Sequence, residues 1–248
     1  MTQDLTGKVA VISGGSSGIG AACARAVAQQ GATVVVGYHT GRDRAEDLCS
    51  TMPGNGHMAV PISLTDCGGH DALAEMLLLR TGRVDILVNS AGYTRRITHN
   101  NLEDMTPAVF NELLIANVGG TFSLTRALLP LLQKGATGVV INISSVSAFT
   151  GLGSNIAYCA AKAGIDTLTK SLARAFGPQV RFLSVSPAAV DTEFVSGRSR
   201  QELEKKALNT PLGRVVTPED VAQSVLACVT HLKTATGTSI VIDGGHSL

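Results

Sequence analysis

Short runs of consecutive apolar residues alternate along the chain with longer stretches in which apolar residues recur every three or four positions. A short apolar run that ends at Gly, Ser or Asn is typical of a strand buried on both faces of a sheet, whereas the longer period indicates an amphipathic helix. The pattern predicts strands over residues 8–13, 33–37, 57–62, 84–89, 138–143, 180–186 and 239–242. It predicts helices over residues 21–30, 42–52, 69–81, 102–132 and 157–176, and one more that starts at Thr217.

Two of the predicted helices have capping signals and one contains a break. Thr217 precedes Pro218 and stands three residues before Asp220, and residues 40–43 have the spacing of a capping box. Within the long helical segment, residues 117–120 (NVGG) predict an irregularity. Residues 188–216 interrupt the alternation, and we expect them to contain one short helix.

Strands and helices alternate from end to end, which indicates a parallel sheet with helices on both faces. Because crossovers between parallel strands are right-handed, a doubly wound, Rossmann-type order is the leading topology. The 248 residues suffice for one large core, and no linker, repeat or low-complexity segment divides them. We therefore predict a single α/β domain over residues 1–248 with a sheet of about seven strands.

Composition and charge exclude several classes of protein. Hydrophobic residues make up 44% of the chain and charged residues 16%, which excludes a disordered protein. The 20 basic and 19 acidic residues leave a net charge of +1, so we expect neither a nucleic-acid partner nor an anionic membrane surface. Residues 1–8 lack the features of a signal peptide, and no apolar run reaches the ~18 residues of a membrane helix.

Cysteine and histidine usage gives no sign of disulfides or metal. The five cysteines are scattered and include no CxxC pair: Cys23, Cys49, Cys67, Cys159 and Cys228. This usage predicts reduced thiols in a cytoplasmic protein, with Cys159 as a buried helix thiol. The six histidines are dispersed as well, so we expect no metal site.

Glycines occupy positions 14, 18 and 20, between the first predicted strand and the first predicted helix. Glycine allows a tight turn there and lets backbone N–H groups approach an anion at the positive N-terminus of the helix. Many strand-to-helix turns need glycine for structure alone, but here further βα units follow, which is the context of a dinucleotide-binding loop. We interpret the loop as the site of a dinucleotide pyrophosphate.

A serine, a tyrosine and a lysine are expected to converge near the fifth strand. Ser145 follows that strand, and Tyr158 and Lys162 stand four residues apart on one face of the next helix. A cation within about 4–6 Å favours the charged form of a phenol, whose free pKa is about 10. With no histidine nearby, the set suits proton transfer better than acyl transfer. The alternative is an ordinary surface Tyr–Lys pair.

Seven short motifs, in order along nearly the whole chain, resemble the short-chain dehydrogenase/reductase family. They are SGGSSGIG (13–20), NSAG (89–92), NVGG (117–120), ISS (143–145), YCAAK (158–162), SPAAVDT (186–192) and IDGG (242–245). Tyr158 also lies 13 positions after Ser145, as the resemblance requires. The resemblance implies an NAD(P)-dependent oxidoreductase that interconverts a carbonyl and a secondary alcohol.

The resemblance also assigns roles to single residues. Tyr158 would be the general acid and base, Lys162 would lower its pKa and hold the nicotinamide ribose, and Ser145 would bind the substrate oxygen. Asn117 would anchor a water that links Lys162 to solvent. The cofactor site would comprise Gly14, Ser16, Ser17, Gly18, Ile19, Gly20, Tyr38, His39, Thr40, Arg42, Ser63, Leu64, Asn89, Ala91, Gly92, Tyr158, Lys162, Pro187, Val190 and Thr192. The chain departs from the family pattern at four positions: Ser13, Ser63, Ser90 and Ala188, the last of which leaves the course of the loop after Pro187 open.

The end of the second predicted strand bears on the choice of cofactor. An NAD-binding fold places Asp or Glu about 20 residues after the glycine loop, where the carboxylate accepts the ribose 2′-hydroxyl. Tyr38 holds that position here, and Asp43 falls beyond the turn. In place of an acid stand His39, Thr40 and Arg42, at the start of a helix whose N-terminus favours anions. We predict NADP(H) as the preferred cofactor and NAD(H) as the weaker one; the alternative is that the arginines at this helix start are only solvated charges.

Two other functions stay open. A cofactor-binding regulator should have lost Ser145, Tyr158 or Lys162, and this chain keeps all three. The runner-up is a 3-oxoacyl-acyl-carrier-protein reductase, because overall similarity points to such enzymes, which dock an acidic carrier protein through basic residues beside the site. The corresponding stretches, residues 134–137 and 177–179, are weakly basic. Basic residues of the 188–216 segment could compensate: Arg198, Arg200, Lys205 and Lys206.

The sequence gives less information about the substrate and the oligomeric state than about the fold and the active site. The small-molecule substrate is expected to contact Tyr93, Arg95, Phe149, Leu152 and Phe194, a mixture that does not define it. The predicted helices within 102–132 and 157–176 have more apolar positions than one sheet face needs, and the last strand can meet its symmetry mate. We therefore predict a homotetramer, with a dimer as the alternative.

Overall fold

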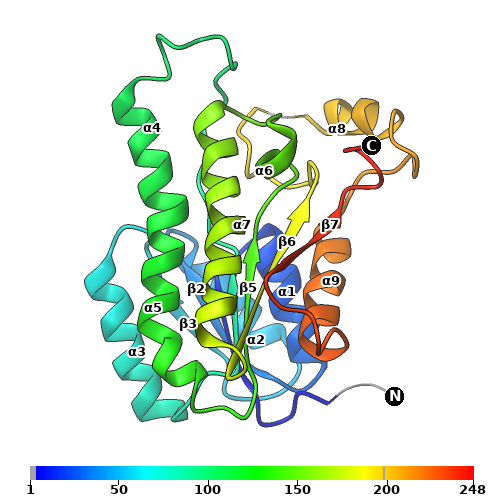
Figure 1. Ribbon diagram of the computed structural model, residues 1–248. Coiled ribbons are helices and arrows are strands. Elements are labelled where there is room, and N and C mark those ends of the chain that lie inside the picture. Colours follow the sequence, from blue (N-terminus) through cyan, green and yellow to red (C-terminus); the bar gives the residue numbers. More distant parts are fainter. Residues whose placement is uncertain (1–3, 198) are drawn as a thin grey trace.

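The computed structural model describes residues 4–197 and 199–248 and is built around one seven-stranded sheet (Figure 1). The strands are β1 (Val9–Ser13), β2 (Thr33–Tyr38), β3 (Met58–Pro61), β4 (Ile86–Asn89), β5 (Gly138–Ile143), β6 (Val180–Pro187) and β7 (Thr238–Ile242). Their order is β3-β2-β1-β4-β5-β6-β7, and all neighbouring strands run parallel. This order confirms the prediction of a single doubly wound α/β fold.

Helices cover both faces of the sheet. They are α1 (Gly18–Gln29), α2 (Arg42–Thr51), α3 (Cys67–Thr81), α4 (Pro107–Leu114), the π-helical η1 (Ile115–Gly119), α5 (Gly120–Leu132), α6 (Ser147–Thr150), α7 (Ile156–Phe176), α8 (Arg200–Ala207) and α9 (Pro218–Thr230). Alternate residues of β1 face different cores: Ala10 and Ile12 pack with α1, α2 and α9, whereas Val9 and Val11 pack with α3, α5 and α7. Both faces of the strands are therefore buried, as their unbroken apolar runs predicted.

The long helical segment begins later than predicted and is interrupted where predicted. α4 begins at Pro107 because the side chain of Thr106 accepts a hydrogen bond from Val109 N at 3.3 Å and proline suits the first turn. The irregularity expected at 117–120 is the π-helix η1, which carries Asn117 at its centre. Such π-turns are frequent at functional sites.

One capping prediction is confirmed and the other is wrong. At α9 the Thr217 hydroxyl accepts from Asp220 N at 3.2 Å, and the Asp220 carboxylate accepts from Thr217 N at 2.9 Å, which is the predicted capping box. At α2 the N-cap is Gly41 rather than Thr40, and no side chain caps the helix. The helix α8 is the short helix expected within 188–216, whereas α6, directly after β5, was not predicted. Arg198 and residues 1–3 lie outside the described residues.

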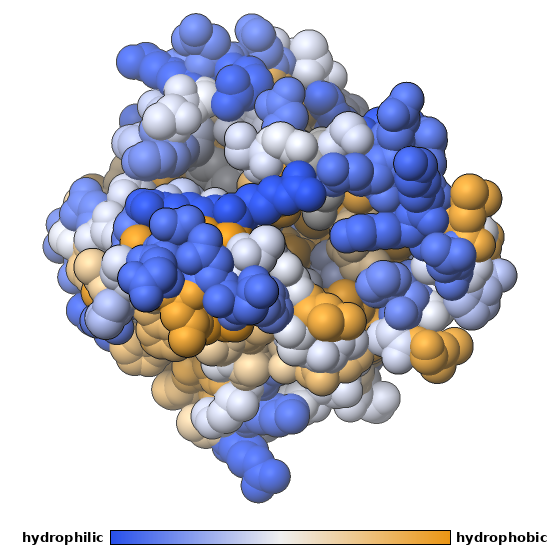
Figure 2. Space-filling model, turned by 90° about the horizontal axis from the view of Figure 1, so that it is seen from above, coloured by the Kyte–Doolittle hydropathy of each residue, from blue (hydrophilic) through white to orange (hydrophobic). Residues whose placement is uncertain are grey.

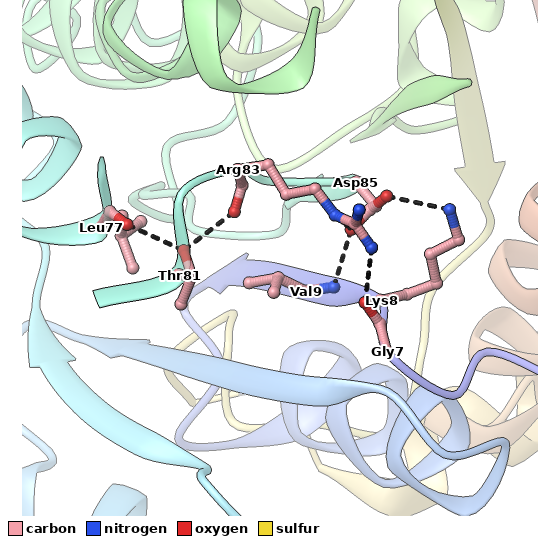
Figure 3. Close-up of polar contacts among 7 residues, drawn as sticks. All are labelled: Gly7, Lys8, Val9, Leu77, Thr81, Arg83 and Asp85. Atoms are coloured by element: carbon pink, nitrogen blue, oxygen red, sulfur yellow. Dashed lines mark hydrogen bonds and ion pairs between the residues drawn. The ribbon is translucent and has the colours of Figure 1, made fainter. Parts of the chain in front are cut away.

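A buried carboxylate holds the amino edge of the sheet, at the start of β1 and β4 (Figure 3). Asp85 is 2% exposed and accepts hydrogen bonds from Lys8 Nζ at 3.0 Å, Val9 N at 3.0 Å and Arg83 Nε at 3.2 Å. The Arg83 guanidinium also donates to Gly7 O at 2.7 Å. Two cations and one backbone donor therefore satisfy this buried charge.

Candidate active site

A cleft of about 1420 Å³ opens at the carboxyl ends of the strands, where open parallel sheets bind their ligands. Figure 2 shows it from above as a hollow with hydrophilic side chains reaching over it. It is lined by the glycine loop, by the loops that follow β2 to β6, and by residues of α7 and α8. All the predicted catalytic and cofactor residues line it except Tyr38, Arg42, Asn89 and Asn117.

The strand β5 and the helix α7 bring Ser145, Tyr158 and Lys162 to this cleft. The Ser145 hydroxyl accepts from Ser147 N and donates to the Ser147 hydroxyl, both at 3.1 Å. Lys162 Nζ donates to Ile143 O at 2.7 Å and lies 5.5 Å from the centre of the Tyr158 ring. The four-residue spacing on α7 thus places the lysine within electrostatic reach of the phenol.

Lys162 is 6% exposed, and among the described residues it forms no ion pair with a carboxylate. Burial lowers the pKa of Lys162 to about 8, while the charge of Asp166, one turn further along α7, opposes that shift. An ammonium group with a pKa near neutrality can exchange protons with water, and its charge favours the ionised form of a nearby phenol. The pair is therefore suited to proton transfer at physiological pH.

Asn117 lies in η1, buried behind the cleft wall, and its side chain forms three hydrogen bonds. Its Oδ1 accepts from Tyr93 N at 3.0 Å, and its Nδ2 donates to Tyr93 O and to Leu113 O, both at 2.8 Å. The amide therefore ties the π-helix to the loop after β4. Both Nδ2 donors are used, so a water beside Lys162 could contact Asn117 only through its backbone or through the second lone pair of Oδ1.

The glycine loop forms a cradle that larger residues would fill. Gly14 has a φ of +64°, and a Cβ there would lie 2.9 Å from the backbone of Ala91. A Cβ at Gly20 would lie 2.2 Å from Gly14 O. The helix α1 begins at Gly18, and the side chain of its N-cap residue, Ser17, forms no capping bond. Close backbone approach and an uncapped helix N-terminus fit the pyrophosphate of a dinucleotide.

The other end of the cleft, after β2 and β3, presents no carboxylate. Its lining residues are His39, Thr40, Gly41, Arg44, Ile62, Ser63, Leu64 and Thr65. Arg42 does not line the cleft; its Nε pairs with Glu46 at 2.7 Å on the outer side of α2. Arg44 takes the place expected for Arg42: a Cβ built on Gly41 would lie 2.5 Å from Arg44 Nη2 and 2.9 Å from Ser16 Oγ.

The side chains of Tyr38 and Asn89 contact the interior and do not line the cleft. Tyr38 packs against the core beneath α1 and α2. Asn89 Nδ2 donates to Thr125 Oγ1 at 3.0 Å and to Asn142 Oδ1 at 2.8 Å, inside the sheet. Both residues stand at strand ends, and their side chains contact the interior, so their contact with the cofactor stays a prediction.

The substrate end of the cleft contains Tyr93, Leu152 and Phe194, as predicted, but neither Arg95 nor Phe149 lines it. The Arg95 guanidinium instead binds Glu112 through both carboxylate oxygens, at 2.7 and 2.9 Å, and the Tyr93 hydroxyl. Sequence reasoning missed the lining residues Arg96, Ile97 and Glu202, from the loop after β4 and from α8, whereas Lys206, which it named only as a basic residue near the site, also lines the cleft.

Sequence reasoning also missed Asn155, which is completely buried beside the site. Its Oδ1 accepts from Tyr158 N at 2.7 Å, so it is the N-cap of α7. An asparagine three residues before Tyr158, at the start of a predicted helix, was the available signal.

Within the ranges that the structure describes, no group of three His, Cys, Asp or Glu side chains is arranged to hold a metal ion. No helix in those ranges is long and apolar enough to cross a membrane. The five cysteines are unpaired, and Cys159 is buried as expected, which raises the pKa of its thiol.

Comparisons with known proteins agree with this geometry. Residues 14–247 match a family model described as Enoyl-(Acyl carrier protein) reductase. The chain is 32% identical over 245 residues to a 3-oxoacyl-acyl-carrier-protein reductase of Thermotoga maritima, covering 97% of this chain and 98% of the relative. It is 32% identical over 251 residues to a D-threitol dehydrogenase of Mycolicibacterium smegmatis, covering 98% and 94%. It superposes with a TM-score of 0.89 on a crystal structure of a short-chain dehydrogenase/reductase from Burkholderia xenovorans, at 31% identity and 99% coverage of both chains.

Proposed function

Because the chain belongs to the short-chain dehydrogenase/reductase family and is thus a nicotinamide-dependent oxidoreductase of carbonyl and CH–OH groups, we propose that Tyr158 is its general acid and base and that it prefers NADP(H). One observation carries the first part of the proposal. Ser145, Tyr158 and Lys162 reach the cleft that also contains the glycine cradle, so a proton donor and a dinucleotide site share one space.

Each side chain has a separate task in the proposed reaction. The nicotinamide, when bound, supplies or accepts the hydride. The Ser145 hydroxyl binds the substrate oxygen beside Tyr158, which gives its proton to that oxygen in reduction and takes it back in oxidation. The positive charge of Lys162 stabilises the phenolate that forms when Tyr158 has given up its proton. Asn117 anchors the water that links Lys162 to solvent, through its backbone or through the second lone pair of Oδ1.

Arg44, rather than Arg42, supports the proposed preference for NADP(H). It lines the cleft beside Ser16 and Gly41, close to the position where a carboxylate would have to stand to bind a 2′-hydroxyl. No carboxylate lines this part of the described cleft. A guanidinium there offers charge-assisted hydrogen bonds to a 2′-phosphate, which contribute about 1.5–3 kcal/mol each.

Steady-state kinetics with both cofactors test this preference. We expect kcat/KM to be roughly 10- to 100-fold higher with NADPH than with NADH, from the free energy of one such contact. Arg44→Ala should remove most of this ratio by raising KM for NADPH, with little change for NADH. Arg42→Ala is the matched control: it removes the same charge two residues away and should keep the ratio. Equal efficiency with both cofactors in the unmodified protein would refute the preference.

The substrate is a small carbonyl or alcohol in our main proposal, and an acyl-carrier-protein thioester is the second candidate. The relative from Thermotoga maritima supports the second candidate, whereas the D-threitol dehydrogenase, at the same identity, supports the first. The charges at the mouth of the cleft favour the first. Three arginines there are already paired with carboxylates: Arg95 with Glu112, Arg96 with Glu202, and Arg200 with Asp191 and Glu204.

A comparison of substrates separates the two candidates. The same 3-oxobutanoyl group is tested as a thioester of pantetheine and as a thioester of an acyl carrier protein. A panel of free ketones and polyols is tested in parallel, and the rate of each reaction is measured from the nicotinamide absorbance. We expect the carrier protein to bring no gain in kcat/KM over pantetheine. A gain of about tenfold or more would favour the carrier-protein reductase. No turnover of any substrate in either direction would point to the third reading, a regulator that binds cofactor without chemistry.

We also propose a homotetramer that works in a reducing compartment such as the cytoplasm. Exposed apolar side chains on η1, α5 and the edge strand β7 support the assembly, among them Ile115, Phe122 and Val241. Unpaired cysteines support the compartment. Light scattering should give a mass four times that of the chain, and a stable monomer at micromolar concentration would refute the assembly.

A further inference from the structure

One buried amide connects the catalytic tyrosine with the wall of the substrate cleft. Asn155 is 0% exposed, and its side chain forms three hydrogen bonds. Oδ1 accepts from Tyr158 N at 2.7 Å, while Nδ2 donates to Arg95 O at 2.7 Å and to Thr94 Oγ1 at 3.2 Å. The acceptor atom thus contacts the helix of the proton donor, and the donor atom contacts the loop after β4.

The contacted loop is part of the cleft. Its residues Tyr93, Arg96 and Ile97 line the cleft on both sides of the two residues that Asn155 holds. The neighbouring Ser154 adds a bond from Ile97 N to its backbone oxygen, at 3.0 Å. At its other end the loop is held by Asn117, through both backbone groups of Tyr93. The loop is therefore fixed between two asparagine side chains, one from η1 and one from α7.

The chemistry of the residue shows that it does more than cap a helix. Ser, Thr, Asp and Asn all cap helices well, because the N-cap needs only an acceptor. Of these, only the amide of Asn also offers two N–H donors in addition to its acceptor oxygen. Here both donors have acceptors in the loop, so all the hydrogen-bonding groups of a completely buried side chain are used.

We propose that Asn155 is a positioning residue for the reaction, with two roles that belong to different atoms. Oδ1 fixes the first turn of α7 and so the direction of the Tyr158 phenol. Nδ2 fixes the loop that forms the substrate wall, so that substrate and proton donor keep their relative position. The proposal rests on the proposed role of Tyr158, and it extends that role to a residue that touches neither substrate nor cofactor.

Two variants separate the two atoms. Asn155→Ser keeps a capping acceptor and removes the amide donor, whereas Asn155→Ala removes both. For Asn155→Ser we expect the KM for the carbonyl substrate to rise about tenfold, while kcat stays within about threefold, because only the loop is released. For Asn155→Ala we expect the same rise in KM and a further drop in kcat of about tenfold, because the phenol also loses its alignment. The KM for the cofactor should stay within about twofold in both variants.

A control variant removes a cap of the same kind at a residue that does not line the cleft. Thr217→Ala at the start of α9 should lower thermal stability and leave both KM values and kcat unchanged. If Asn155 were merely structural, Asn155→Ser would behave like this control. An unchanged substrate KM in Asn155→Ser, or an equal rise of both KM values, would overturn the proposal.

Hydrogen exchange gives a readout that does not depend on turnover. In Asn155→Ser the backbone amides of residues 93–97 should exchange faster, while those of residues 156–160 keep their protection; in Asn155→Ala both segments should exchange faster. Joint loosening of both segments in Asn155→Ser would also overturn the proposal. Failure of the proposed function would appear differently, as full activity in Tyr158→Phe or as no activity in the unmodified protein.

Discussion

Asp85 and Lys162 are both buried charged side chains, at opposite edges of the sheet. They differ in the partners that surround them. Asp85, at the amino edge of the sheet, is 2% exposed and receives hydrogen bonds from two cations and a backbone N–H. Lys162, at the carboxyl edge, is 6% exposed, donates to the carbonyl of Ile143, and has no carboxylate partner among the described residues. One charge is neutralised by its surroundings, and the other is not.

This difference in partners indicates a different role for each of the two charged side chains. The buried carboxylate of Asp85 is satisfied by two cations and a backbone N–H, and a change that leaves the buried groups of such a set unsatisfied is costly. A buried ammonium group without an ion-pair partner costs free energy, which the charge of Asp166 offsets only in part, and that cost appears as the lowered pKa of Lys162. Such a cost persists in a folded protein when the charge has a function. The buried charge at the amino edge thus stabilises the sheet, and the one at the carboxyl edge belongs to the proposed active site.

The largest effect is expected at the carboxyl edge, from the loss of a single oxygen atom. Tyr158→Phe should lower kcat by about 10²–10⁴-fold, because it removes a positioned proton donor. Unfolding free energy and affinity for NADPH should hardly change. Tyr38→Phe is the matched control, because its hydroxyl is also lost but outside the cleft lining. The role of Tyr158 would be wrong if the variant kept more than a tenth of the turnover when chemistry limits the rate.

The next largest effect is expected at the amino edge, on stability instead of turnover. Asp85→Asn should lower the free energy of unfolding by roughly 2–3 kcal/mol, because it leaves a buried polar group facing donors that it cannot satisfy. Asp71→Asn is the control: its carboxylate pairs with Arg126 at 3.4 Å but is exposed, so we expect a change below about 0.5 kcal/mol. Urea unfolding at equal protein concentration measures both. A fall in kcat of more than about threefold in folded Asp85→Asn would contradict the division of tasks.

The pH dependence of stability gives a third effect, with a defined sign. The pKa of Lys162 is about 8 in the folded protein and 10.5 ordinarily, so between these values the unfolded chain binds more protons than the folded one. Stability relative to Lys162→Met should therefore rise as pH increases from about 8 towards 10.5, by on the order of 3 kcal/mol at most. Urea unfolding of both proteins across this range measures the difference, in which the titrations of groups that do not interact with Lys162 cancel. A difference that falls with rising pH would contradict the proposed cause of the shift.

The smallest effect is expected when only one cation is removed from Asp85. Lys8→Met should lower the free energy of unfolding by at most about 1 kcal/mol, because Lys8 is one-third exposed and Arg83 and Val9 N still contact the carboxylate. Added salt should reduce this small loss further. A loss as large as that of Asp85→Asn would show that one ion pair, rather than the whole set, carries the stabilisation.

The parts of this molecule that depend on local pattern were predictable from the sequence. The strand β5 has the bounds that its apolar run predicted, Gly138–Ile143, because glycine and serine end the run on both sides. Tyr158 and Lys162 face the cleft together because four residues make about one turn of a helix. The capping box at Thr217 and Asp220 is likewise local, as every atom involved lies within four residues.

The parts that depend on how a helix is rotated against the rest of the fold, or on a partner far along the chain, were not predictable. α2 begins at Arg42 as predicted, but its N-cap is Gly41 rather than Thr40, and residues two apart on a helix point in opposite directions. The rotation of the helix about its axis therefore decides whether Arg42 or Arg44 reaches the cleft. Asn155 is recognisable as a cap from the sequence, but its bonds to Thr94 and Arg95 join residues about 60 positions apart. Such contacts appear only once the fold has placed the loops.

The most direct test of the division between the two edges is the unfolding free energy of Lys162→Met at pH 7, without cofactor and at the same protein concentration as the unmodified protein. Methionine fills a similar volume without a charge, so the variant is relieved of the cost of burying an ammonium group and loses one hydrogen bond to Ile143 O. We predict a variant at least as stable as the unmodified protein and nearly devoid of turnover. A loss of about 2 kcal/mol or more, comparable to that of Asp85→Asn, would show that Lys162 holds the fold together as Asp85 does and would contradict this account.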